Sequence, residues 1–138
     1  MIAKEVLKAF QKARYFEPGI YQTWTISDGR VYVDMLGILF WAQHGHLPAN
    51  MSTDEIIAKT AILNEFAREH GYDAMLAVIQ GWHGLTLWPG LPAEYYDLGR
   101  NLAIALGAVN PDCPWQKENW GLRMKALAKV KEVEYALA

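Results

Sequence analysis

The feature that most constrains this fold is a β-hairpin signal in a chain whose other segments are patterned as helices. Residues 20–26 and 31–33 are rich in β-branched and aromatic side chains, and Asp28-Gly29 lies between them. Aspartate followed by glycine supplies the positive φ angles that a tight hairpin turn requires. Because two strands alone are marginally stable in water, the hairpin must pack against helices.

The remaining segments predict about six helices. Apolar side chains recur in them every three or four residues, and glycines and prolines separate them. The expected helices span residues 2–15, 35–43, 52–70, 74–80, 92–107 and about 115–137. Ser52 and Glu55 form a capping box, and Asp73 is expected to cap the fourth helix. The expected helix ends fall at Pro18-Gly19, Gly45, Gly71 and Gly107.

Segment 35–43 is apolar almost throughout and fits either a buried strand or a helix. We favour the helix, since Gly45 stands where a helix C-cap belongs and His44 would lie in the last turn. Alternating strand–helix units are absent, which argues against a parallel sheet. The predicted fold class is therefore mainly α with one small β-hairpin (α+β), with about six helices around one core in a single domain, residues 1–138.

The composition indicates a folded protein of the cytoplasm. The 138 residues are 52% hydrophobic and 20% charged, which excludes a disordered chain. The single cysteine, Cys113, excludes an internal disulfide framework and a cysteine-rich zinc site. A net charge of −2 argues against general nucleic-acid binding. The chain opens without an apolar signal core and has no uncharged run long enough to span a membrane, so we expect no membrane partner.

Residues 81–90 have the strongest features of a binding site. This segment is expected to be a loop in which glycines free the backbone and Trp82, His83 and Trp88 lie close together, with Tyr96 soon after. Aromatic rings on a flexible backbone can stack a planar ligand such as a nucleobase. The alternative is that the two tryptophans pin the loop to the core.

Arg30 and Arg100 are the candidate cations for an anionic ligand. Arg30 flanks the hairpin turn near Trp24, and an arginine beside aromatic rings can bind phosphate or carboxylate. An ordinary solvated position beside the turn explains Arg30 equally well. In the predicted site, Trp24, Trp82 or Trp88 stacks the ligand, and Arg30 or Arg100 neutralises its charge.

The sequence offers no complete motif for a metal centre or a nucleophilic enzyme. His44 and His46 form a pair typical of zinc or copper ligation, but no further ligands are indicated, so we predict no metal and no cofactor. The serines already have structural roles, and Walker, HExxH and GxSxG motifs are absent. We favour a protein without catalytic activity. The alternative is a small hydrolase or transferase that gathers Asp34, His44 and His83.

The last expected helix carries a basic face and an apolar stripe. Its basic side chains, Arg123 among them, fit either an anionic partner or a solvated face. The stripe consists of Trp120, Met124, Leu127, Val130 and Leu137. A second copy of the chain would cover this stripe if the core is already filled, so we expect a homo-oligomer through the C-terminal helix. A structural helical adaptor is therefore a third hypothesis.

Several short segments of the first half form a recognisable set. They are Val6-Leu7-Lys8-Ala9, Gly19-Ile20-Tyr21-Gln22, Asp28-Gly29-Arg30 and Leu36-Gly37-Ile38-Leu39. Together they resemble a group of small uncharacterised proteins from phages and their bacterial hosts. Trp82-His83 loosely matches a Trp-Asn-Asp of that group, whereas Asp34-Met35 fills the stretch where the group often carries a cysteine. The resemblance implies a phage or mobile-element accessory protein and implies no activity.

These observations lead to one main hypothesis. We predict a non-catalytic binding protein that sequesters a small anionic or nucleotide-like ligand, or that inhibits a host protein. The predicted ligand-binding residues are Trp82, His83, Trp88, Trp24, Arg30, Tyr96 and Arg100.

Overall fold

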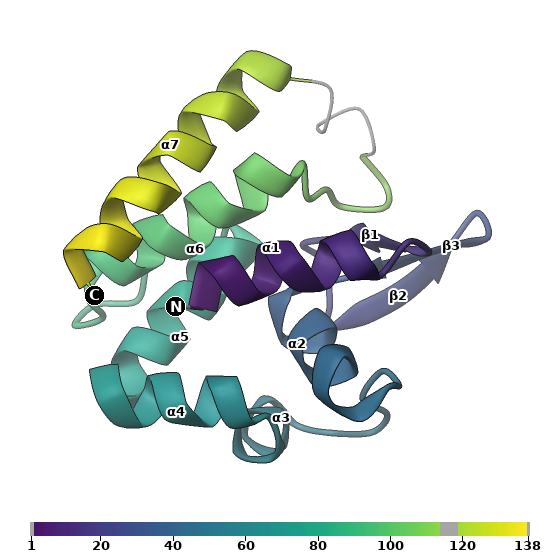
Figure 1. Cartoon of the computed structure of the whole chain (residues 1–138), viewed down its shortest axis with the longest axis horizontal. Helices are drawn as coiled ribbons and strands as arrows, with labels where there is room; N and C mark the ends of the chain where they lie inside the picture. The colour runs from purple at the N-terminus through teal and green to yellow at the C-terminus, as the bar shows by residue number, and fades with distance from the viewer. Residues whose placement is uncertain (1, 114–118, 138) are drawn as a thin grey trace.

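The computed structural model describes residues 2–113 and 119–137, with side chains as far as residue 132. This part of the chain contains seven helices and three short strands. In chain order they are α1 (Ile2–Lys12), β1 (Phe16–Pro18), β2 (Trp24–Ser27), β3 (Arg30–Val33), α2 (Met35–His44), α3 (Thr53–Lys59), α4 (Ala61–His70), α5 (Tyr72–His83), α6 (Ala93–Leu106) and α7 (Trp120–Leu137). The predicted class, mainly helical with a small sheet, is confirmed (Figure 1).

A single hydrophobic cluster joins these elements, because each helix contributes buried apolar side chains to it. Representative members from α1 to α7 are Ile2, Phe40, Ile56, Leu63, Met75, Leu98 and Val130. Figure 1 shows α6 and α7 lying side by side, with the sheet at the opposite side of the molecule from the C-terminus. The most extensive helix packing is that of α6 with α5 and with α7.

The sheet is built around the predicted hairpin. β2 and β3 pair antiparallel, with Ser27 opposite Arg30, so that Asp28 and Gly29 form a two-residue turn. Their φ angles are 51° and 73°, the left-handed values that an Asp-Gly turn adopts. The hairpin prediction is confirmed, although its first strand begins only at Trp24.

β1 differs from the sequence expectation, which extends the first helix to residue 15. α1 ends at Lys12, and residues 16–18 run parallel to β3, which gives the strand order β1-β3-β2. The sheet is therefore mixed: it contains one short parallel pair that the hairpin prediction did not include, and it is not a parallel sheet of alternating strand–helix units. Pro18 is tolerated in β1 because this strand lies at the edge of the sheet, where a missing amide donor costs less.

The third expected helix is divided at Thr60 into α3 and α4. Thr60 has an extended backbone, with φ −111° and ψ 108°. At this break, the Gln43 side chain donates to the carbonyl of Lys59 and accepts from the amide of Ala61, over 3.1 and 2.7 Å. The imidazole of His44 bonds to the same Lys59 carbonyl. The single-helix expectation is wrong because α2 supplies partners for the backbone groups that the break exposes.

α5 is longer than expected at both ends. It starts one residue before Asp73, which therefore lies in the first turn and not at the N-cap. It continues through Trp82 to His83, and Gly84 caps it with a left-handed φ of 70°. The expected loop over residues 81–90 therefore begins only at Gly84, so Trp82 and His83 are helical.

α5 and α6 cross with their backbones in close contact. A Cβ on Gly81 would lie 1.9 Å from the carbonyl oxygen of Tyr96, and a Cβ on Gly99 would lie 2.0 Å from that of Val78. Only glycine fits at both positions, because any side chain would push the helices apart. This crossing places Arg100 beside the C-terminal end of α5.

Other predicted helix features are confirmed. Segment 35–43 is helical, and Gly45 caps α2 with a φ of 79°. Gly107 ends α6 in the same left-handed conformation, with a φ of 68°. The side chain of Ser52 accepts from the amide of Glu55 and so caps α3, as the capping box predicts.

The apolar stripe expected on the last helix is only partly buried. Val130 is buried and Ala126, outside the predicted stripe, is buried too. Trp120 and Met124 are 65% and 46% exposed, so the predicted burial of these two residues is wrong. α7 therefore packs on α6 through a face that includes Ala126 and Val130 and leaves Trp120 and Met124 largely in solvent. The expected helix start near residue 115 and the Leu137 side chain lie outside the described residues.

Candidate functional site

Asp34 is a fully buried carboxylate at the first turn of α2. It directly precedes the apolar helix, and its Oδ1 accepts from the amide of Gly37 over 2.9 Å. Its own amide donates to the carbonyl of Thr23, which ties it to the chain before β2. An acidic side chain at a helix N-terminus satisfies an unpaired amide and faces the positive end of the helix dipole. An aspartate directly before an apolar helix is a capping signal that the sequence contains.

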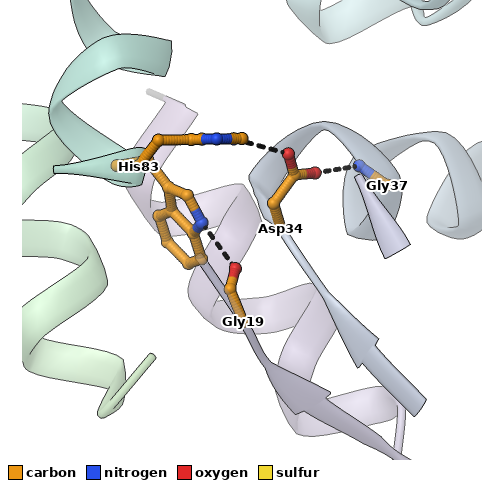
Figure 2. Close-up of polar contacts among 5 residues, drawn as sticks. Gly19, Asp34, Gly37 and His83 are labelled. Atoms are coloured by element: carbon orange, nitrogen blue, oxygen red, sulfur yellow. Dashed lines mark hydrogen bonds and ion pairs between the residues drawn. The ribbon is translucent and has the colours of Figure 1, made fainter. Parts of the chain in front are cut away.

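His83 lies at the last turn of α5 and contacts this carboxylate. Its Nε2–H donates to Oδ2 of Asp34 over 2.8 Å, and its side chain is 18% exposed. Figure 2 shows the imidazole pointing toward Asp34, whose other oxygen faces Gly37. The indole N–H of Trp82, the preceding residue, donates to the carbonyl of Gly19 over 2.9 Å. These bonds fasten the end of α5 to the start of α2 and to the strand region.

The three-residue acid–base site considered from the sequence is not formed. Asp34 and His83 meet, but His44 lies at the other end of α2, about 15 Å away for a ten-residue helix. Its Nε2 bonds to the Lys59 carbonyl instead. Because both carboxylate oxygens of Asp34 are engaged and buried, the Asp34–His83 pair serves as a structural link between two helices.

Trp82 belongs to the hydrophobic core and not to a ligand site. Its side chain is fully buried, and its ring stacks on Phe10 with an interplanar angle of 1°. The sequence alternative in which Trp82 pins its segment to the core is the one that the structure supports. The predicted stacking role of Trp82 depends on its lying in a flexible loop. Because Trp82 lies in a helix, this argument for stacking no longer applies.

The other predicted aromatic residues have separate partners. Trp88 is 59% exposed, and its amide donates to the Gln80 side chain. The hydroxyl of Tyr96 donates to the carbonyl of Leu85 and so holds the same loop. The half-buried Trp24 donates from its indole to the carbonyl of Pro48. No ring contact between these three aromatic side chains occurs among the described residues, so they do not form one stacking platform.

Arg30 is exposed at the start of β3, and its side chain has no ionic or stacking partner among the residues that the structure describes. It extends from the hairpin turn, where Ser27 is its strand neighbour. The simpler sequence interpretation, a solvated position beside the turn, accounts for it.

Arg100 lines a cavity of about 540 Å³ between α6, the start of α7 and the segment before β2. The cavity is lined by Ile20, Arg100, Ile104, Gly107, Ala108, Asn119, Leu122 and Arg123. Among the residues that the structure describes, the lining contains two arginines and no acidic side chain. Its volume falls in the range of cavities that hold small organic ligands, roughly 300–1,000 Å³.

The guanidinium of Arg100 lies beside the end of α5 without an anionic partner among the described residues. It lies over Gly84, where an added Cβ would be only 2.2 Å from its Nη1. Burial lowers the pKa of Arg100 below its ordinary value, and the nearby Tyr96 partly opposes this effect. Within residues 2–113 and 119–132, no carboxylate and no hydrogen-bond acceptor pairs with the guanidinium. The C-terminal end of α5 is the negative end of a helix dipole and gives partial compensation.

Arg123 brings a second guanidinium to the cavity from α7. Its Nε–H donates to the carbonyl of Ala105 over 3.2 Å, and its guanidinium lies 5.1 Å from the ring centre of Trp120. Asn119 caps α7 by accepting from the amide of Leu122. These contacts hold the side chain of Arg123, and its terminal nitrogens have no hydrogen-bond partner among the residues that the structure describes. Sequence reasoning placed Arg123 on a basic helix face but gave no signal that it meets Arg100.

The comparisons leave the family of the chain open. No family model matches it, and neither a curated protein nor a solved structure matches it significantly. No cluster of three or more metal-ligating side chains occurs in the described part of the chain. None of the helices there is long and apolar enough to cross a membrane.

Proposed function

We propose that this chain is a non-catalytic binding protein that holds a small anionic ligand in the cavity between α6 and α7. The observation that carries the proposal is the guanidinium of Arg100, partly buried and without an anion among the described residues. Removing a charge from water costs free energy unless a partner compensates it. A bound anion would supply that partner.

The second arginine supports the same function. Arg100 and Arg123 come from two different helices and line one cavity, and no acidic side chain in the described part of the chain lines it. Two guanidinium groups offer several N–H donors in a planar arrangement, which suits carboxylates and phosphates. The arginine predicted from the sequence to neutralise the ligand is therefore retained in the proposal. The aromatic stacking is not, because the described lining of the cavity contains no aromatic side chain.

The test measures thermal unfolding with inorganic phosphate, adenosine monophosphate or phenylacetate at constant ionic strength. At least one of these anions should raise the Tm of the natural protein, because a ligand that binds only the folded state stabilises it. Arg100→Gln should abolish the increase. Arg14→Gln removes an exposed arginine outside the cavity and should leave the increase unchanged. Equal increases in both variants, or no increase with any of the three anions, would contradict the proposal.

A further inference from the structure

We propose that the ligand of this cavity is a carboxylate carried on an apolar body, such as an aryl or branched-alkyl acid. This inference rests on the proposed function and narrows its ligand class. It follows from the division of the cavity into a cationic part and an apolar part.

The cationic part is suited to one compact planar anion. Arg100 lies over Gly84, and Arg123 is held by the Ala105 carbonyl and the Trp120 ring. Guanidinium groups that are oriented in advance lose little side-chain entropy when they bind. A carboxylate matches the paired donors of a guanidinium in a bidentate arrangement.

The apolar part requires a ligand that extends beyond its charged group. Ile20, Ile104 and Ala108 line the cavity together with Leu122, which is 47% exposed. An apolar ligand body would cover these side chains and remove them from water, which is favourable in proportion to the area covered. A free phosphate ion is too small to contact this wall while it is bound to the arginines.

A nucleotide fits the lining less well than an apolar acid. None of the described side chains that line the cavity is aromatic, so a nucleobase would have no ring among them on which to stack. Asn119 is the only uncharged polar side chain in the lining as far as residues 2–113 and 119–132 are concerned, and its oxygen already accepts from the amide of Leu122. Sugar hydroxyls and base edges would therefore find few partners here.

Calorimetric titration with five probes tests the ligand class. The probes are phenylacetate, its neutral isostere phenylacetamide, acetate, inorganic phosphate and adenosine monophosphate. Phenylacetate should bind tightest, and loss of its charge in phenylacetamide should weaken binding about tenfold or more, the size expected for a charge-assisted hydrogen bond. Acetate should bind weakly because it lacks the apolar body.

Three variants assign these effects to the two parts of the cavity. Arg100→Gln should weaken binding of phenylacetate about tenfold or more and leave phenylacetamide unchanged. Leu122→Ser, at a half-exposed position, should weaken phenylacetate and leave acetate unchanged. Arg14→Gln, at an exposed position on the chain before β1, should have no effect.

Gly84→Ala tests whether the placement of Arg100 matters, and Gly45→Ala is its matched control. Both glycines cap helices with a positive φ, so both substitutions should reduce stability to a similar extent. Only a Cβ at position 84 would meet the guanidinium of Arg100, whereas a Cβ at position 45 has open space around it. Gly84→Ala should therefore weaken phenylacetate binding severalfold and Gly45→Ala should not.

The outcomes separate this inference from the proposed function. If phosphate or adenosine monophosphate binds more tightly than phenylacetate, and binding requires Arg100, the cavity binds anions and the inferred ligand class is wrong. If no probe shows binding that depends on Arg100, both the ligand class and the proposed function are wrong. Phenylacetate binding that depends on both Arg100 and Leu122 supports both.

Discussion

In the proposed function, Arg100 binds the ligand, and its partly buried charge lowers the stability of the folded protein. Its guanidinium is desolvated by the surrounding helices, yet no anion among the described residues compensates the charge. Its side chain extends from α6 to Gly84 at the end of α5, and the stems of long cationic side chains commonly pack on apolar surface. An uncharged side chain of similar length would keep this packing and avoid the cost of burying a charge.

Arg100→Met should therefore raise the stability of the ligand-free protein while it removes anion binding. The expected gain in unfolding free energy is about 0.5–1 kcal/mol, typical of relieving a functional site of strain. Thermal unfolding in a buffer without binding anions measures it. A marked decrease in Tm would mean that Arg100 has a structural partner and would count against a ligand role.

The side chain of Asp34 makes two hydrogen bonds, one with the Gly37 amide and one with the His83 imidazole. Asp34→Ala removes the acceptors for the Gly37 amide and the His83 imidazole, so unfolding free energy should fall by about 3 kcal/mol. Asp34→Asn keeps an oxygen for the Gly37 amide, and its NH₂ can donate to the other His83 tautomer, so the loss should be about 1 kcal/mol. Urea unfolding measures both values. Equal losses in the two variants would contradict the capping role.

Turns and helix caps could be predicted from the sequence where they depend on the backbone preference of a single residue. The Asp28-Gly29 turn and the left-handed caps at Gly45 and Gly107 follow from backbone preferences alone. The break at Thr60 could not be predicted, because its stabilising partners come from Gln43 and His44 on another helix. Local periodicity contains no information about such distant hydrogen bonds.

At the scale of elements, the α5–α6 crossing positions both the buried link of Figure 2 and the proposed cavity. The same helix pair carries His83 at the end of α5 and Arg100 on α6. The sequence shows Gly81 and Gly99 but not that each faces the backbone of the other helix. The prediction of a loop at residues 81–83 was wrong because the sequence alone does not distinguish a glycine required for close helix packing from a glycine required for a turn.

Gly81→Ala should be severely destabilising because its Cβ would collide with the backbone of α6 and not with a movable side chain. We expect a loss of roughly 3 kcal/mol or more, at the upper end for overpacking of a core. Gly121→Ala in α7 is the matched control, because its Cβ would meet only Asn119 Oδ1 at an ordinary contact distance of 4.0 Å and alanine favours helices. This variant should be neutral or slightly stabilising. Chemical denaturation compares the two, and similar stabilities would contradict the close crossing.

At the scale of the whole molecule, the fold class could be predicted but the cavity could not. Helical periodicity and one hairpin signal determine the class, because both are local patterns. The cavity requires residue 20, residues 100–108 and residues 119–123 to converge, and these segments are far apart in sequence. Sequence reasoning selected Arg100 by residue type, while Arg123 and the apolar wall became apparent only in the structure. Self-association through the last helix stays a prediction.

The measurement that tests the central claim most directly is the ¹⁵N–¹H NMR spectrum of the arginine side chains during titration with phenylacetate and, separately, phosphate. Arg100→Lys and Arg123→Lys assign the two Nε–H signals. Binding in the cavity should shift the signals of Arg100 and Arg123 together along one saturating curve, because both line it. The exposed Arg14 and Arg30 should stay unchanged at constant ionic strength. If neither anion moves the Arg100 signal, or if all arginines shift alike without saturation, the cavity does not hold an anion.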